Sequence, residues 1–342
     1  MNPVAGILLI ALGSIGAASF YVPLKKVKEW AWESYWIVQG VAAWLIAPWV
    51  FALIFVPSGE LIPIINESPS SAKLMSMFFG VLWGFGGLTF GLSMRYLGVA
   101  LGQSIALGLC AAFGTIIPAV VAGQNLFGSR AGILTLVGVA VTVAGIAIIG
   151  YAGALKSREM TEEQKRAAVK EFALKKGILI AIFAGIMSAC FNFGFEAGKP
   201  IEDVALAHGT NPLFQKNPTL IFILFGGFIT NLVYCGYLNI RNKTYNDYYT
   251  SSGSVLMNNL FFTFLAGFLW FLQFHFFGMG SSKLPAGMAV FGWSILMALN
   301  IAISNIWGII LKEWKGVNTR IIVILVIGII VLILSAFVVK LS

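Results

Sequence analysis

The sequence predicts an all-α polytopic membrane protein with ten transmembrane helices in a five-plus-five inverted repeat. Two features of the composition support this class: 59% of the 342 residues are hydrophobic and 10% are charged, whereas soluble proteins carry about 25% charged residues. The third observation is that the apolar residues fall into ten long runs. The basic residues lie between these runs, so the net charge of +9 favours membrane anchoring over nucleic-acid binding.

Each run is long enough for a spanning helix, which needs about 20 mainly apolar residues because the bilayer interior cannot hydrogen-bond the backbone. Turn-forming segments such as "VPSGELIPIINESPSSAK" separate most of the runs. The first run lacks a basic leader and a cleavage site, so we expect a retained span and not a signal peptide. The expected spans are residues 4–22, 34–56, 73–95, 100–122, 131–151, 177–197, 218–238, 256–277, 286–311 and 319–340.

The distribution of lysine and arginine predicts the orientation of the chain. Sixteen of the 22 basic residues fall in alternate loops, which the positive-inside rule places in the cytoplasm, so both termini are expected outside. The longest charged segment, residues 153–176, separates two expected five-span repeats, residues 1–152 and 177–342. Thr161 and Gln164 have capping-box spacing, which predicts a short surface helix, although a solvated linker explains the segment equally well.

The layout of five spans, a linker and five spans indicates a duplication. Because five is odd, the second half would enter the membrane upside down, as in many secondary transporters. "GSIGAASFYVP" is similar to "GIMSACFNFGF", and "MRYLGVALG" is similar to "FHFFGMGSS", which aligns Arg95 with His275. We therefore expect spans three–four and eight–nine to form inner and outer gates, with Arg95 and Tyr96 at the inner gate. A membrane-surface anchor is the alternative role for Arg95.

The third span contains four glycines, Gly80, Gly84, Gly87 and Gly91, at intervals close to one helical turn. Small residues let helix backbones approach closely within a membrane. The pattern therefore favours static helix packing, while a smooth face along which helices slide is the alternative.

Three motifs resemble the L-rhamnose–proton symporter family: "GAASFYVPLKKVKEWAWESYW" at residues 16–36, "MRYLG" at 94–98 and "LKEW" at 311–314. The resemblance covers essentially the whole chain. It implies a member of the drug/metabolite transporter superfamily in a bacterial cytoplasmic (inner) membrane, with spans one to four and six to nine around a central cavity. The implied partners are L-rhamnose or a related deoxyhexose, protons and the lipid bilayer. The resemblance also implies an aspartate early in span nine, where this chain reads "LPAGMAVFGW", so the coupling residue stays open.

Polar side chains inside the spans are the candidates for sugar binding. A pyranose has hydroxyls that need hydrogen-bond partners and C–H faces that stack on aromatic rings, so amides and indoles are the expected contacts. Asn300 is the best placed amide, and it shares a helix face with Trp293. An interhelical hydrogen bond is the alternative role for each amide. The candidates are Gln39, Gln103, Asn192, Trp270, Gln273, Trp293 and Asn300.

Two residues are candidates for proton coupling. Glu196 is expected to be the carboxylate deepest in the membrane, with Lys199 on the same helix face; a surface Glu–Lys pair is the alternative. His275 is the second candidate, because an ordinary histidine titrates near pH 6.5. His208 lies in a predicted loop and is given no special role.

The leading functional hypothesis is a proton-coupled L-rhamnose importer that works by alternating access. The alternatives are a carrier of another sugar or small metabolite, a carrier coupled to a different cation, and a membrane sensor or scaffold. The short loops disfavour a sensor. The sequence shows no paired histidines, no nucleophile–base set and no phosphate loop, so neither an enzyme nor a bound cofactor or metal is expected.

Overall fold

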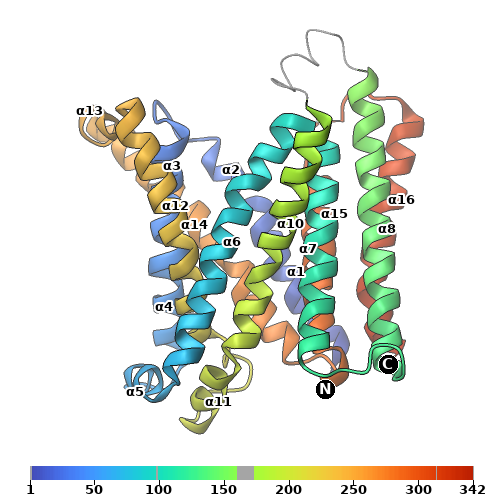
Figure 1. Ribbon diagram of the computed structural model, residues 1–342. Helices are drawn as coiled ribbons and strands as arrows, with labels where there is room; N and C mark the ends of the chain where they lie inside the picture. The colour runs from blue at the N-terminus through green and yellow to red at the C-terminus, as the bar shows by residue number, and fades with distance from the viewer. Residues whose placement is uncertain (1, 98, 160–172, 313, 342) are drawn as a thin grey trace. The chain divides into compact units, whose positions relative to one another are not determined.

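The computed structural model describes residues 2–97, 99–159, 173–312 and 314–341 (Figure 1). The described residues are mostly helical and contain no strand. Ten segments of this described part are long and apolar enough to cross a membrane, which confirms the predicted number of spans. These spans are Pro3–Leu24, Trp32–Phe55, Ser70–Met94, Gly102–Val121, Arg130–Glu159, Leu174–Ala207, Asn217–Asn242, Gly253–Ser281, Met288–Ile310 and Thr319–Leu341.

Several spans contain more than one helical segment. The α-helices are α1 (Pro3–Ser19), α2 (Tyr21–Leu24), α3 (Trp32–Gly40), α4 (Ala47–Phe55), α5 (Leu61–Glu67), α6 (Ser70–Leu97), α7 (Val99–Val121), α8 (Arg130–Glu159), α10 (Leu174–Ala197), α11 (Lys199–Ala207), α12 (Asn217–Asn242), α13 (Asp247–Thr250), α14 (Gly253–Ser281), α15 (Gly292–Ile310) and α16 (Thr319–Ala336). A π-helix, η1 (Val41–Ile46), and three 3-10 helices, η2 (Thr244–Asn246), η3 (Ala286–Phe291) and η4 (Phe337–Leu341), complete the set.

Two spans run further than the sequence predicted. The fifth was expected to end at residue 151, but α8 continues to Glu159. The sixth was expected to end at residue 197, but α11 follows α10 after Gly198, with Pro200 in its first turn, where a missing backbone N–H costs nothing. The short helix expected around Thr161 and Gln164 lies outside the described residues.

The chain forms two compact units. The first contains residues 1–11, 85–192 and 280–342, and the second contains residues 12–84 and 193–279. Spans four, five, nine and ten belong to the first unit and spans two and seven to the second, while spans one, three, six and eight contribute to both. In the predicted repeat, spans one to five correspond to spans six to ten in order. The two spans of each corresponding pair therefore belong to the same unit or are divided between both. This distribution fits the inverted repeat, which remains a prediction together with its boundaries at 1–152 and 177–342.

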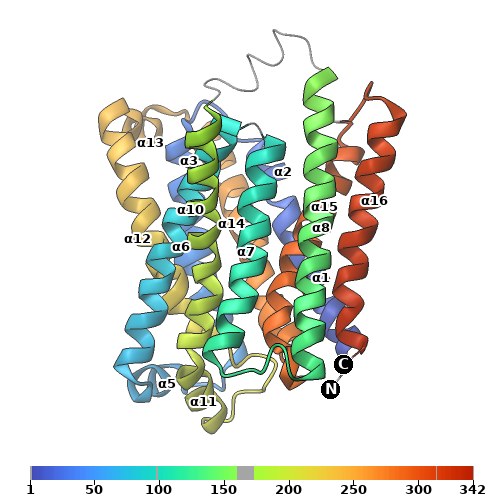
Figure 2. The same ribbon diagram turned by 45° about the vertical axis from the view of Figure 1, so that its right-hand side comes forward.

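In the first unit, α8 and α16 run side by side in both views (Figures 1 and 2). Small residues permit this approach: a methyl group on Gly145 would lie 2.6 Å from Leu332, and one on Gly328 would lie 2.6 Å from Ile149. Thr142 Oγ1 also donates a hydrogen bond to Ser335 Oγ at 3.0 Å.

In the second unit, α12 packs against α3, η1 and α4. It also approaches the first half of α6, where a methyl group on Gly80 would lie 2.0 Å from the Ile223 carbonyl oxygen and one on Gly84 would lie 2.6 Å from Thr230. Gly80 and Gly84 therefore have the predicted packing role, whereas a methyl group on Gly87 or Gly91 would meet no described atom within 4 Å, so the prediction is wrong for these two. At one end of the unit, α5 and α11 lie together (Figures 1 and 2).

Candidate functional site

Span two is interrupted by the π-helix η1, and its sequence explains why. Pro48 follows η1 and has no backbone N–H, so it cannot complete a regular α-helical turn. Gly40 precedes η1, and a methyl group there would lie 2.6 Å from the Trp44 ring. Because π-helical turns inside α-helices occur frequently at functional sites, Trp44 in η1 is a candidate site residue.

Trp44 lies in a cluster of four indoles, which we call the tryptophan cluster: Trp36, Trp44, Trp83 and Trp270. The Trp44 ring meets each of the other three edge to face, with centroids 6.1 Å from Trp36, 6.0 Å from Trp83 and 5.7 Å from Trp270. The rings come from α3, η1, α6 and α14, all within the second unit. The cluster therefore combines broad apolar faces with indole N–H donors.

Gln39, three residues after Trp36 on α3, and Trp44 of the cluster contain buried polar groups without hydrogen-bond partners among the described residues. Gln39 is fully buried, and neither Nε2 nor Oε1 has a hydrogen-bond partner among the described residues. The same holds for Nε1 of Trp44, which is 3% exposed. A buried polar group without a partner costs about 1–3 kcal/mol. These groups provide unused donors and an unused acceptor next to indole rings that meet edge to face.

Other polar groups around the cluster are already hydrogen-bonded. Trp36 Nε1 donates to Asn231 Oδ1 at 3.1 Å, and Asn231 Nδ2 donates to the Gly227 carbonyl at 2.9 Å. Gln273, one turn beyond Trp270 on α14, donates from Nε2 to the Trp270 carbonyl at 3.1 Å. Three of the predicted sugar contacts, Gln39, Trp270 and Gln273, thus belong to this unit.

The remaining predicted sugar contacts belong to the first unit. Asn192 Nδ2 donates to the Gly114 carbonyl at 2.7 Å, and Trp293 Nε1 donates to the Cys110 carbonyl at 3.2 Å, so both side chains bind the same part of α7. The Trp293 ring also stacks on Phe191, with centroids 5.8 Å apart. Gln103 on α7 and Asn300 on α15 are half-buried. The structure therefore divides the candidates between two units.

The predicted gating residues lie near the end of α6 in the first unit. The side chain of Arg95 lies outside the described part of the chain. Tyr96 is buried, and Lys176 Nζ lies 4.6 Å from the centre of its ring. The Ala173 amide donates to the Tyr96 carbonyl at 3.3 Å. Tyr96 is thus attached to the start of α10.

His275, a predicted proton carrier, is buried among phenylalanine rings of the second unit. Its ring centroid lies 4.7 Å from that of Phe51 and 4.9 Å from that of Phe55. Its Nδ1 lies 3.0 Å from Asn217 Oδ1. His275 therefore joins α14 to the first residue of α12, five residues beyond Trp270 of the tryptophan cluster.

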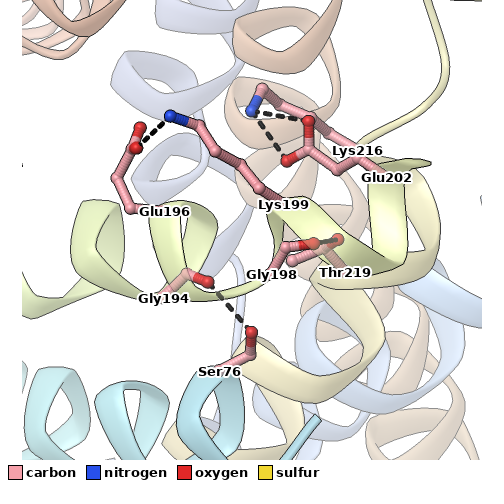
Figure 3. Close-up of polar contacts among 8 residues, drawn as sticks. All are labelled: Ser76, Gly194, Glu196, Gly198, Lys199, Glu202, Lys216 and Thr219. Carbon is pink, nitrogen blue, oxygen red and sulfur yellow. Dashed lines mark hydrogen bonds and ion pairs between the residues drawn. The ribbon is translucent and has the colours of Figure 1, made fainter. Parts of the chain in front are cut away.

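Glu196, the other predicted proton carrier, forms an ion pair with Lys199, which was the alternative to a coupling role (Figure 3). The two side chains are 22% and 52% exposed. Sequence reasoning missed a more buried carboxylate in the same span: Glu202 on α11 is 5% exposed. Lys216 Nζ lies 2.8 Å from Glu202 Oε1 and 3.1 Å from Oε2.

His208 also has partners that the sequence did not reveal. Its Nδ1 lies 2.7 Å from Glu60 Oε2, and its Nε2 lies 2.9 Å from Glu67 Oε2. The hydrogen bonds with Glu60 and then Glu67 raise the pKa of His208 above its ordinary value. The histidine thus links the end of α11 to both ends of α5.

The fold and this site define a polytopic helical membrane protein with a candidate site for a small polar solute. The family model of the L-rhamnose-proton symport protein (RhaT) matches residues 2–342. An L-rhamnose-proton symporter of Yersinia pestis (strain Pestoides F) is 37% identical over 344 residues, covering 99% of this chain and 98% of the relative. A symporter of the same name from Yersinia pseudotuberculosis (serotype O:1b, strain IP 31758) gives the same values. The chain belongs to the L-rhamnose-proton symport protein family.

Proposed function

We propose that the chain imports L-rhamnose together with protons across a bacterial cytoplasmic membrane by alternating access. The full-length match to symporters of that name supports the substrate and the coupling ion. The structural observation that carries the proposal is the fully buried Gln39 beside the tryptophan cluster, whose two polar side-chain atoms have no hydrogen-bond partner among the described residues. We also propose that the family falls within the drug/metabolite transporter superfamily, which the ten spans fit.

The chemistry of L-rhamnose suits these groups. A deoxyhexose has a methyl group and C–H faces, which pack favourably on indole rings. Its hydroxyls both donate and accept hydrogen bonds, as the Gln39 amide does. We propose that Gln39, Trp44, Trp270 and Gln273 bind the sugar, since Trp44 and Gln39 gain in the complex the hydrogen bonds that they otherwise lack. Gln103, Asn192, Trp293 and Asn300 remain candidate contacts, and Arg95 and Tyr96 remain candidate gating residues.

The orientation of the chain is also a proposal. The excess of basic residues in alternate loops supports an outward position for both termini, for α5 and for α11. In this orientation His208 and its carboxylate partners face the outside, which is the side from which protons and sugar enter.

Uptake into proteoliposomes with an imposed ion gradient tests the proposed function. A pH gradient, acidic outside, is expected to drive accumulation of L-rhamnose above its equilibrium level, and a sodium gradient alone is not. L-fucose and L-lyxose serve as comparison sugars. Accumulation driven by sodium alone would contradict the coupling ion. Failure to transport any of the three sugars would contradict the substrate class, whereas preferential uptake of L-fucose or L-lyxose would identify a carrier of another sugar.

A further inference from the structure

The buried ion pair of Glu202 and Lys216 lies where span six is interrupted. A methyl group on Gly198 would lie 2.2 Å from Thr219 and 2.9 Å from Ser76 Oγ, so the break between α10 and α11 sits tightly against α12 and α6. Ser76 Oγ donates to the Gly194 carbonyl at 2.9 Å, and Thr219 Oγ1 donates to the Gly198 carbonyl at 3.3 Å (Figure 3). These bonds satisfy two carbonyls at the break and fix the start of α11, which carries Glu202.

The pair is more buried than the neighbouring Glu196–Lys199 pair. The side chains of Glu202 and Lys216 are 6% and 14% exposed. The ammonium group also lies 4.9 Å from the centre of the Phe195 ring. Removing two charges from water is costly, and a buried pair is often no more stabilising than apolar residues of the same size. Span six includes Glu202 near its C-terminal end, and Lys216 directly precedes span seven. Ionisable residues within membrane spans commonly serve ion and proton pathways.

Lys216 and the residue after it, Asn217, connect the pair to the helix that carries part of the proposed sugar site. Lys216 directly precedes Asn217, whose Oδ1 lies 3.0 Å from His275 Nδ1. A methyl group on Gly278 would lie 3.2 Å from Lys216 Cβ, so α14 packs directly on the lysine. The same helix carries Trp270 and Gln273. A shift of α14 on sugar binding would therefore act on Lys216.

We propose that Glu202 carries the transported proton and that Lys216 occupies its place when the proton is absent, an inference that rests on the proposed function. A proton from the outer solution adds to a carboxylate oxygen of Glu202, and the Lys216 ammonium moves away. After the protein opens inward, the proton leaves and Lys216 pairs with Glu202 again. A buried carboxylate is costly unless it is protonated or paired with a cation. Glu202 is therefore either protonated or paired with Lys216 at every stage of transport.

Other charged groups lie around the pair, and Glu196 and Lys199 interact electrostatically with Glu202. Asp203 on α11 is exposed, and Lys199 pairs with Glu196. His208 contacts Glu60 and Glu67 from α5. Lys73 of α6 donates to the Ile65 carbonyl, and His275 of α14 reaches the pair through Asn217. In the part of the chain that the structure describes, Lys216 is the cation in direct contact with Glu202.

The test compares Glu202→Gln with Asp203→Asn, which changes the adjacent, exposed carboxylate of the same helix in the same way. Each protein is reconstituted and assayed for accumulation of L-rhamnose driven by a pH gradient, for proton uptake on sugar addition, and for exchange of internal against external L-rhamnose. Glu202→Gln is expected to retain exchange and to lose accumulation and proton uptake. Asp203→Asn is expected to retain all three activities.

A double variant, Glu202→Gln with Lys216→Gln, removes both charges and so leaves no unpaired lysine. It is expected to show the same loss of coupling with exchange retained. Accumulation at the wild-type level by Glu202→Gln or by the double variant would overturn the proposal. Loss of exchange in both variants would assign the pair a structural role and would also overturn it. The proposed function fails separately, if the unmodified protein shows no proton-driven L-rhamnose accumulation.

Discussion

The indole rings of Trp44 and Trp270 meet edge to face, with centroids 5.7 Å apart and planes at 81°. One ring belongs to the π-helical segment of span two and the other to span eight. The two backbones are also close, because a methyl group on Gly267, one turn before Trp270, would lie 2.7 Å from the Gln39 carbonyl oxygen. The Gln39 amide, which has no partner among the described residues, and the two indole rings are thus positioned by the same helix crossing.

Replacing Gln39 with methionine is expected to stabilise the sugar-free protein while weakening L-rhamnose binding. Methionine has a similar volume and removes a buried amide whose lack of partners costs about 1–3 kcal/mol per group. Thermal unfolding in detergent should therefore show a higher Tm without sugar. Loss of a sugar hydrogen bond should weaken binding roughly tenfold, which corresponds to about 1.4 kcal/mol.

Gln124→Met is the matched control, because Gln124 Oε1 is also buried and unpartnered among the described residues but lies in the loop after α7. This variant should leave L-rhamnose affinity unchanged. Unchanged affinity of both variants would remove Gln39 from the sugar site.

Replacing Trp44 with phenylalanine is expected to weaken L-rhamnose binding about three- to tenfold. The substitution keeps an aromatic ring but removes the buried Nε1–H, and a hydrogen bond contributes about 0.5–1.5 kcal/mol. Calorimetric titration with L-rhamnose measures the change. Trp49→Phe on α4 is the control, since Trp49 is 40% exposed. Equal affinities for the two variants would show that the Trp44 N–H is not a sugar contact.

The thermal stability of the protein is expected to fall as the pH rises above the ordinary histidine pKa, through the contact of His208 with Glu60 and Glu67. Because the folded-state pKa of His208 is raised, its contribution is fully present below the ordinary histidine pKa of about 6.5 and is lost as the pH passes the raised value. The Tm of the His208→Gln variant, measured by thermal unfolding over the same pH range, should not show the fall that this histidine causes. The same pH dependence in wild type and variant would refute this account.

Glu196→Gln is expected to accumulate L-rhamnose against its gradient at close to the wild-type level. The ion pair of Glu196 with Lys199 is partly exposed, and exposed pairs contribute at most about 1 kcal/mol. Proton-driven uptake measures the outcome. A variant that exchanges L-rhamnose but cannot concentrate it would make Glu196 the coupling carboxylate and would confirm the prediction drawn from the sequence.

The sequence predicted the ten spans because long apolar runs have few structural alternatives in a membrane. It also singled out Gln39 and Trp270, since an amide or indole inside such a run needs an explanation. It missed Trp44 and Trp83, because a tryptophan among apolar residues does not reveal which other rings it meets. Pro48 in the middle of span two was the available signal for the π-helical segment.

Glu202 was missed for a different reason. Span six was expected to end at residue 197, although the helical chain continues through α11 and buries Glu202. Its partner Lys216 follows 14 residues later, after a loop, so a tertiary contact makes the pair. The partners of His208 are more than 140 residues away in the sequence, so local sequence patterns do not predict these contacts either.

The position of L-rhamnose in a structure of the sugar-bound protein tests the central claim most directly. The account predicts that the sugar ring lies against an indole of the tryptophan cluster, with a hydroxyl oxygen within about 3.2 Å of the Gln39 amide. L-rhamnose bound elsewhere, with Gln39 still lacking a hydrogen-bond partner, would contradict it.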